Sequence, residues 1–146
     1  ASAIVLAAAG PAADAQERPA WIQGIAHHVD PLHLGQRDLT RAPSAERAAQ
    51  AAGVAGGPVD VAELHAPFSH QELVLRRELG LDPSATVNPS GGALAGNPMF
   101  TGGLNRIGEA ARRVWDGSAG RVVGHATSGP ALQQNLVCVM SSEATT

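Results

Sequence analysis

The stretch from Val87 to Pro98, which reads VNPSGGALAGNP, constrains the fold more than any other part of the chain. It is rich in glycine and proline and carries no charge. Because glycine leaves the backbone too free and proline removes a hydrogen-bond donor, this stretch cannot form the interior of a regular helix or strand. It is also too apolar for a solvated linker. We therefore expect an ordered loop in which the backbone closely approaches either another backbone segment or a ligand.

A long helix is predicted directly after this loop, over Thr101–Trp115. A glycine-rich loop that ends at a helix N-terminus is a common place for polar ligand groups, and a tight structural crossover is the alternative. Gly102, Gly103 and Gly108 weaken the helix intrinsically, and they permit close packing on another helix. The apolar residues recur every three or four positions and form one stripe: Leu104, Ile107, Ala111, Val114 and Trp115.

Length and composition exclude several classes of protein. The 146 residues are enough for one domain with a real core. The net charge of −3 is mild and unclustered, so nothing suggests nucleic acid as a partner. No apolar run approaches about 18 residues, so we expect no membrane span. The lone Cys138 rules out an internal disulfide and fits a reducing compartment, from which we expect a cytoplasmic protein.

Alternating strand and helix patterns predict an α/β fold, with a sheet that carries helices on its faces. The last two strands are joined by Ser128-Gly129-Pro130, a hairpin-like turn. Residues 1–140 are expected to form the domain and residues 141–146 a loose tail. The expected strands are Ser2–Ala8, Ala20–Val29, Val59–Leu64, Arg121–Thr127 and Leu132–Met140, and the expected helices are Thr40–Ala52, Phe68–Leu79 and Thr101–Trp115.

The loop and the residues after it resemble the C-terminal half of the thiolase superfamily. Asn88–Leu94 matches the pattern Asn-x-x-Gly-Gly-x-(Leu/Ile), Gly96-Asn97-Pro98 matches Gly-His-Pro, and Thr101-Gly102 matches the Thr-Gly that opens a helix. Ala1–Ala7 is similar to the strand after the family's Asp-Gly-Ala turn.

Two further motifs are closest to the sterol-carrier/lipid-transfer thiolase-like (acetyl-CoA acetyltransferase) branch. Glu63–Ser69 resembles that branch's His-Asp-Cys-Phe-Ser motif, and Gln133–Asn135 resembles its Gln-His-Asn. The resemblance implies a thiolase-like half-domain, a five-stranded mixed sheet with helices on both faces. It also implies that the nucleophilic cysteine lies on an N-terminal half, as a partner in a homo- or hetero-oligomer. The chain is then one subunit of a split enzyme or a fragment.

His65 and Asn97 are the candidate catalytic residues. His65 follows an apolar strand and precedes a helix, and open α/β sheets bind ligands at the carboxyl ends of strands. In the resemblance, both positions face the catalytic cysteine. The chain departs from the family in two places, because Pro67 replaces the motif cysteine and Asn97 replaces the Gly-His-Pro histidine. An amide cannot accept a proton at neutral pH, so ordinary thiolase proton transfers are in question.

A second resemblance reconciles these departures with catalysis. Ketoacyl-carrier-protein synthases that start fatty-acid synthesis share the superfold and use Cys, His and Asn, with the last two at the positions of His65 and Asn97. His65 would then generate a thiolate, or donate a hydrogen bond with Asn97 to a thioester enolate oxygen. This implies acyl-CoA or an acyl-carrier thioester as substrate, with no bound cofactor. The residues expected to bind substrate are Phe68, Gly96, Pro98, Ser128 and Gly129.

Other polar residues have a structural interpretation beside a functional one. His27, His28 and His33 are close in sequence, but their spacing fits no site with four protein ligands, and we expect no metal. His70 either lines the same pocket as His65 or is an exposed helix residue. His125 is core or lies behind the site. Cys138 is a buried structural thiol by default. The alternative is a catalytic role, because biosynthetic thiolases have an acid/base cysteine near this region, although their Cys-x-Gly signature is absent here.

Two other functions stay open. One is a steroid or lipid side-chain lyase that acts by retro-aldol cleavage beside a small zinc-ribbon/OB-fold protein. The loss of two family catalytic residues favours it, and the absence of tyrosine counts against it. The other is a non-catalytic scaffold half that shapes a dimer or a partner's site.

Overall fold

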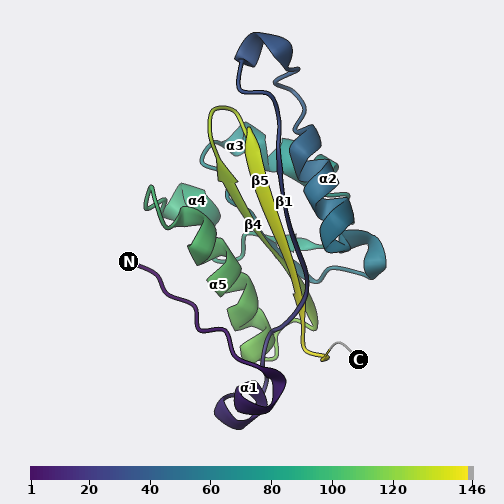
Figure 1. The fold of residues 1–146 in the computed structure, drawn as a ribbon, viewed down its shortest axis with the longest axis vertical. Coiled ribbons are helices and arrows are strands. Elements are labelled where there is room, and N and C mark those ends of the chain that lie inside the picture. Colours follow the sequence, from purple (N-terminus) through teal and green to yellow (C-terminus); the bar gives the residue numbers. More distant parts are fainter. Residues whose placement is uncertain (145–146) are drawn as a thin grey trace.

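A computed structural model describes residues 1–144 of the chain (Figure 1). One mixed sheet of five strands lies between helices, in the order β1-β5-β4-β2-β3. The strands are β1 (Trp21–Val29), β2 (Val61–Glu63), β3 (Thr86–Val87), β4 (Arg121–Ser128) and β5 (Gln134–Ser141). The helices are α1 (Ala9–Ala15), α2 (Pro43–Ala52), α3 (Ser69–Glu78), α4 (Gly92–Ala95) and α5 (Gly102–Trp115), with short 3₁₀ turns at Leu34–Gln36 and Val54–Gly56.

The sheet is parallel at one end and antiparallel at the other. β2 runs parallel to both β3 and β4, whereas β5 is antiparallel to β4 and to β1. The connection from β4 to β5 is the predicted hairpin, and the longer crossovers that parallel strands require contain helices. The predicted α/β class and the five-stranded mixed sheet with helices on both faces are therefore confirmed.

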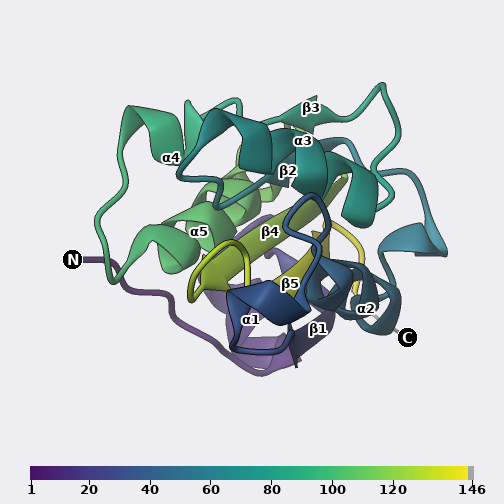
Figure 2. The same cartoon turned by 90° about the horizontal axis from the view of Figure 1, so that it is seen from above.

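Two apolar clusters hold the layers together, one on each face of the sheet. Helices α2 and α3 lie on one face and α5 lies on the other (Figure 2). On the first face, α2 and α3 pack alanines and leucines against Val123, Val137 and Val139. On the other face, α5 packs Ala110, Ala111 and Val114 against Val122, Cys138 and Met140. Successive side chains of β4 and β5 thus point to opposite faces of the sheet, as they do along any β-strand.

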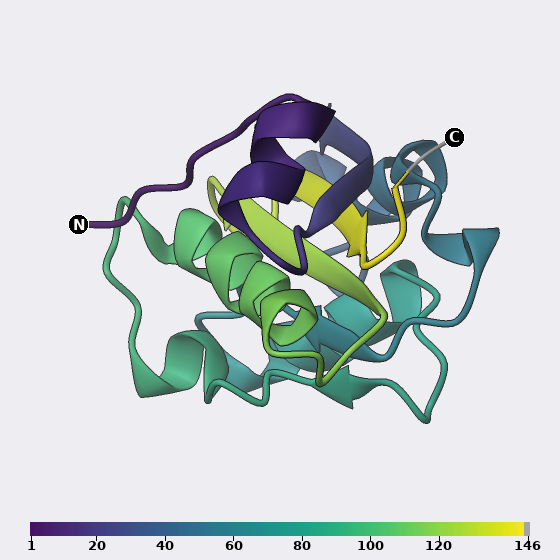
Figure 3. The ribbon, with the colours of Figure 1, turned by 90° about the horizontal axis from the view of Figure 1, so that it is seen from below.

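Residues 2–8, predicted to be a strand, form no strand. They run as an irregular trace outside α5 before α1 begins (Figure 3). Val5 and Leu6 are 91% and 75% exposed, because no strand of this sheet pairs with the segment. An isolated strand leaves its backbone groups without partners, so apolar composition alone does not make one. The fifth strand is instead β3, whose Val87 the sequence placed in the loop.

The remaining boundaries differ from the prediction by a few residues. α2 begins at Pro43 rather than Thr40, and it ends at Ala52, before Gly53, which is left-handed with φ of 78°. At the C-terminus, Ser141 is buried and is the last residue of β5, one position beyond the predicted domain end. Residues 145–146 of the predicted tail lie outside the described residues. Within residues 1–144, no helix has the length and apolar character needed to cross a membrane.

Candidate functional site

His65 lies two residues beyond the end of β2 and is only 7% exposed. Its Nε2 atom is 2.9 Å from Oδ1 of Asn97, and the backbone N–H of Thr127 donates to its Nδ1 atom at 3.4 Å. Since Nδ1 accepts a hydrogen bond, the neutral ring carries its proton on Nε2 and donates it to Asn97. The structure thus brings together the two predicted catalytic residues, which come from different elements.

The loop Val87–Pro98, in which no helix was expected, contains the single helical turn α4, and a hydrogen-bonded asparagine orders it. Asn88 is left-handed with φ of 52°; its Oδ1 accepts from the N–H of Leu64 at 2.7 Å and its Nδ2 donates to Glu72 at 2.7 Å. Gly91 and Gly92 also have positive φ, and a Cβ on Gly92 would lie 2.9 Å from Cγ of Asn88. The loop is therefore attached to the residue before His65, and glycine is required where the backbone folds onto Asn88.

Two glycines at the start of α5 bring the helix against the site. A Cβ on Gly102 would come within 2.7 Å of both Nε2 of His65 and Oδ1 of Asn97, and one on Gly103 would collide with Ala126 of β4. The sequence interpretation assigned these glycines to packing on another helix, but Gly102 and Gly103 pack on the site and on the chain's own sheet. Gly108 has open space beside it.

His65 and Asn97 line a cavity of about 320 Å³. Of the residues expected to bind substrate, Phe68, Ser128 and Gly129 line it, whereas Gly96 and Pro98 flank Asn97 and are not part of the lining. The sequence analysis did not single out several other lining residues: Gln71, Met99, Thr127, Ala131 and Leu132.

One wall of the cavity is the turn between β4 and β5. Ala131 and Leu132 are left-handed, with φ of 50° and 57°, which is uncommon for residues other than glycine. Arg37 donates to the carbonyls of Pro130 and Ala131, and Asn135 donates to that of Leu132 at 2.8 Å. Gly129-Pro130 signals a turn in the sequence, but Arg37, which binds the turn from one side, is more than 90 positions away in the chain.

A buried polar chain lies behind this wall. His125 is fully buried and its Nε2 is 2.9 Å from Oδ1 of Asn135, which donates in turn to Ser44. Burial lowers the pKa of His125 to about 4, so its ring is neutral at neutral pH. Ser44 then donates a hydrogen bond to Asp30. Burial alone would raise the pKa of the Asp30 carboxyl, but the hydrogen bonds from Ser44 and Arg47 outweigh burial and hold this pKa below its ordinary value.

A buried ion pair at the base of the site was missed by the sequence analysis. Glu63 is fully buried; its carboxylate accepts from the backbone N–H and the hydroxyl of Ser90, and from Arg106 of α5 at 3.0 Å. Arg106 also donates to the Ser90 hydroxyl at 2.7 Å. An acidic residue inside an apolar strand pattern is a signal that could have been used, because a fully buried carboxylate needs a partner.

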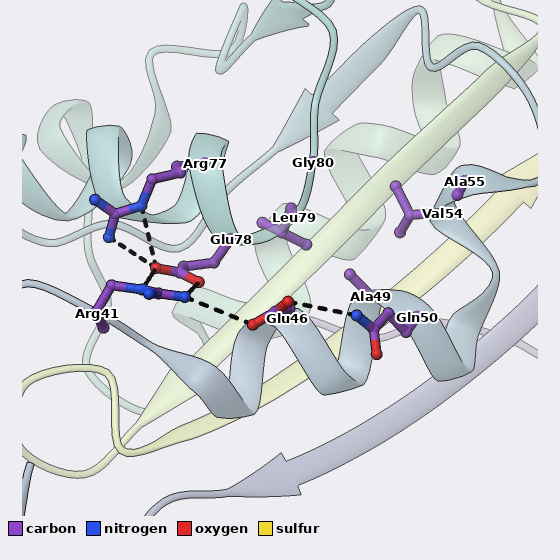
Figure 4. Close-up of a pocket in the computed structure, with 10 residues that line it drawn as sticks. All are labelled: Arg41, Glu46, Ala49, Gln50, Val54, Ala55, Arg77, Glu78, Leu79 and Gly80. Atoms are coloured by element: carbon purple, nitrogen blue, oxygen red, sulfur yellow. Dashed lines mark hydrogen bonds and ion pairs between the residues drawn. The ribbon is translucent and has the colours of Figure 1, made fainter.

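A second cavity, of about 420 Å³, lies between α2 and α3 (Figure 4). Its charged residues satisfy one another: Arg41 and Arg77 both bind Glu78, and Arg41 also approaches Glu46. Burial raises the pKa of Glu78, but the hydrogen bonds and charges of Arg41 and Arg77 outweigh it and hold the pKa below its ordinary value. No residue predicted to be catalytic or to bind substrate lines this cavity.

The other candidates lie outside the His65–Asn97 cavity. His70 stacks on the ring of Phe68 at a centroid distance of 6.0 Å. Cys138 is buried in the core, and burial raises the pKa of its thiol to about 11. Among residues 1–144, no group of His, Cys, Asp or Glu side chains is arranged to hold a metal ion.

Sequence relatives of part of the chain are thiolases, although no model of a known protein family matches it. The chain is 40% identical over 77 residues to the 3-oxoadipyl-CoA/3-oxo-5,6-dehydrosuberyl-CoA thiolase of Escherichia coli (strain K12), a match to 51% of this chain and 18% of that protein. It is 36% identical over 76 residues to the acetyl-CoA acetyltransferase of Paracoccus denitrificans, with the same shares. The matched region is thus about a fifth of these relatives' length.

Solved structures match over more of the chain. A monomeric SCP2-thiolase-like protein type 1 from Mycobacterium smegmatis superposes with a TM-score of 0.71 at 22% identity, covering 86% of this chain and 30% of that one. Human mitochondrial 3-ketoacyl-CoA thiolase gives a TM-score of 0.64 at 24% identity, covering 85% and 30%. The chain is thus similar in sequence to thiolases over about half its length, and over most of its length its fold is similar to the C-terminal portion of thiolase-superfamily proteins.

Proposed function

We propose that this chain is the C-terminal half or subunit of a thiolase-like acyltransferase or Claisen-type condensing enzyme that acts on acyl thioesters. The observation that carries the proposal is the His65–Asn97 pair, with Nε2 and Oδ1 2.9 Å apart beside a cavity. The relatives that bear the names thiolase and acetyl-CoA acetyltransferase support the same class of reaction.

The pair suits polarisation of a thioester carbonyl. His65 carries its proton on Nε2, and Asn97 uses Oδ1 to accept it, which leaves the Asn97 Nδ2–H groups available to a ligand. A thioester oxygen that enters between the two side chains would take over the Nε2–H hydrogen bond of His65 from Oδ1 of Asn97, and it would accept a second hydrogen bond from Nδ2–H of Asn97. Donors fixed before the reaction stabilise the charge that develops on such an oxygen, and this effect is often the largest single one.

The nucleophile would come from a companion segment. The residues that line the cavity include no cysteine, and Cys138 is buried elsewhere. A companion thiolate would attack the carbonyl carbon, so that a carbon–sulfur bond forms and the carbonyl electrons move to the oxygen held by His65 and Asn97. Collapse of this intermediate would expel the carrier thiolate and leave an acyl group on the companion cysteine.

Asn97 sets this site apart from one with a histidine at that position. The amide donates a hydrogen bond but cannot act as a base, and Nδ1 of His65 is occupied by the N–H of Thr127. We therefore assign the pair to carbonyl polarisation rather than to removal of a proton from the nucleophile.

The companion would dock on apolar side chains that surround the cavity and the outer side of α5. Met99 and Phe100 are 80% and 95% exposed shortly before α5, and Leu104 and Trp115 on the helix are 36% and 44% exposed. Large exposed apolar side chains of this kind mark interaction surfaces when they gather near one site.

The test is acylation of the native assembly, in which the chain is bound to its companion, followed by intact mass spectrometry after incubation with acetyl-CoA. We expect an increase of one acetyl group on the companion and none on this chain. Asn97→Ala and His65→Ala should slow acylation by about a hundredfold, the effect of removing one oxyanion donor. His70→Ala is the matched control, since His70 is a nearby histidine outside the cavity lining, and it should acylate at the normal rate. Equal rates in all variants would leave only a scaffold role.

A further inference from the structure

The chain from β2 to His65 contacts α5 at two successive places, which we call the Glu63 layer and the His65 layer. Glu63, the last residue of β2, and His65, two residues later, both contact α5. Arg106 of α5 binds Glu63, and Gly102, one helical turn earlier, packs on His65. The loop Val87–Pro98 enters both layers, with Ser90 in the first and Asn97 in the second.

The two charged residues of the Glu63 layer are buried. Glu63 is 0% exposed and Arg106 is 6% exposed, and every hydrogen bond of the carboxylate goes to Ser90 or Arg106. The three residues therefore join the strand, the loop and the helix at one point. Buried, charge-assisted hydrogen bonds have strict geometry, so this point fixes the separation of the three elements.

The His65 layer depends on that separation. Gly102 leaves no room between the helix backbone and the two side chains, because a Cβ there would come within 2.7 Å of both Nε2 of His65 and Oδ1 of Asn97. A small outward shift of α5 or of the loop would open the contact between His65 and Asn97. The catalytic pair has no other hydrogen bond that ties Asn97 to β2 among the described residues.

We propose that Glu63 is a positioning residue for the His65–Asn97 pair, which it holds closed through Ser90 and Arg106. It touches neither the cavity nor a reacting atom. This inference depends on the proposed function in one respect only, which is the catalytic role assigned to His65 and Asn97. Its test observes the pair without substrate, so its failure would leave the acylation result unaffected, and a failed acylation test would leave this geometry intact.

The experiment compares Glu63→Gln with Glu78→Gln in the full chain. Glu78 is a matched control, because it is also a buried carboxylate held by arginines, but it lies in α3 away from the pair. The readout is nitrogen NMR of the His65 ring at about pH 8, where an ordinary imidazole is neutral. The His65 signals are identified by their loss in His65→Gln.

In the unaltered chain we expect one tautomer, with the proton on Nε2, and slow exchange of that proton with water. Glu63→Gln should give a mixture of tautomers and exchange about tenfold faster, the size expected when one net hydrogen bond is lost. Glu78→Gln should leave both observations unchanged, even if it lowers stability equally. An unchanged His65 in Glu63→Gln, or the same change in Glu78→Gln, would overturn the proposal.

Ser90→Ala keeps the test decisive if Glu63→Gln does not fold. It removes one hydroxyl from the layer and leaves the Glu63–Arg106 ion pair in place. We expect proton exchange at Nε2 of His65 to become about threefold faster, because part of one hydrogen-bonded contact is lost. If Ser90→Ala folds and His65 exchanges at the original rate, Glu63 does not position the pair.

Discussion

Gly102 lies against His65 so closely that a side chain at position 102 would come within 2.7 Å of Nε2 of the ring. The start of α5 therefore forms part of the site, and it explains why the helix begins with glycine despite the low helix propensity of that residue.

Gly102→Ala tests this contact. We expect a loss of about 2 kcal/mol in the free energy of unfolding, since overpacking a rigid site forces its neighbours apart. Gly108→Ala is the control within the same helix, because Gly108 has open space beside it. It should raise stability by up to about 1 kcal/mol, through helix propensity alone. Urea unfolding measures both, and a neutral Gly102→Ala would contradict the close contact.

His125 predicts a pH dependence of stability. Its folded pKa is about 4, against an ordinary value of 6.5, so the unfolded chain binds more protons between these values. Stability should therefore be complete above pH 6.5 and fall as the pH drops toward 4, by about 3 kcal/mol from this group.

The variant His125→Gln isolates this effect, because an amide can still donate to Asn135 but does not titrate. Its stability should fall less steeply than that of the unaltered chain between pH 6.5 and 4. Thermal unfolding across that range compares them. If the stability of the two proteins changes in parallel with pH, the pKa of His125 is the same in the folded chain as in the unfolded chain.

Cys138 should react slowly with thiol reagents. Burial raises its pKa to about 11 from the model-compound value of 9.0, which lowers the thiolate fraction by about a hundredfold before steric exclusion is counted. Alkylation with iodoacetamide at pH 8, followed by mass spectrometry, should label the urea-unfolded chain quickly and the folded chain hardly at all. Rapid labelling of the folded chain would place this thiol at the surface.

Asn88→Asp should destabilise the loop Val87–Pro98. The new carboxylate could still accept from the N–H of Leu64, but it could not donate to Glu72 and would repel it. We expect a loss of about 1 to 3 kcal/mol at neutral pH, the cost of an unmade buried hydrogen bond. Part of this loss should return near pH 4, where one carboxyl is protonated. A loss that does not depend on pH would contradict the contact with Glu72.

The sequence predicted the parts of the structure that depend on local patterns. The apolar stripe of α5, the turn at Gly129 and the positions of β1, β4 and β5 all follow from spacing within one element. The pairing of His65 with Asn97 was expected from the resemblance to known enzymes, which supplied the long-range information that spacing lacks.

Features that depend on distant partners were missed or misread. Residues 2–8 have the composition of a strand, but no neighbouring strand pairs with them in this sheet. β3 has only two residues and exists because β2 is beside it. The Glu63–Arg106 pair spans 43 positions of sequence, so the local pattern can indicate that Glu63 needs a partner but does not identify Arg106. In each case the tertiary contact decides what the local sequence leaves undetermined.

The central claim is that His65 and Asn97 polarise the carbonyl of an acyl thioester. Infrared difference spectroscopy of carbon-13-labelled acetyl-CoA, bound to the native assembly, observes that carbonyl directly. Hydrogen bonds from both residues should lower its stretching frequency relative to water, and Asn97→Ala and His65→Ala should each reverse part of the shift. A carbonyl frequency that is the same in all three proteins would contradict the account.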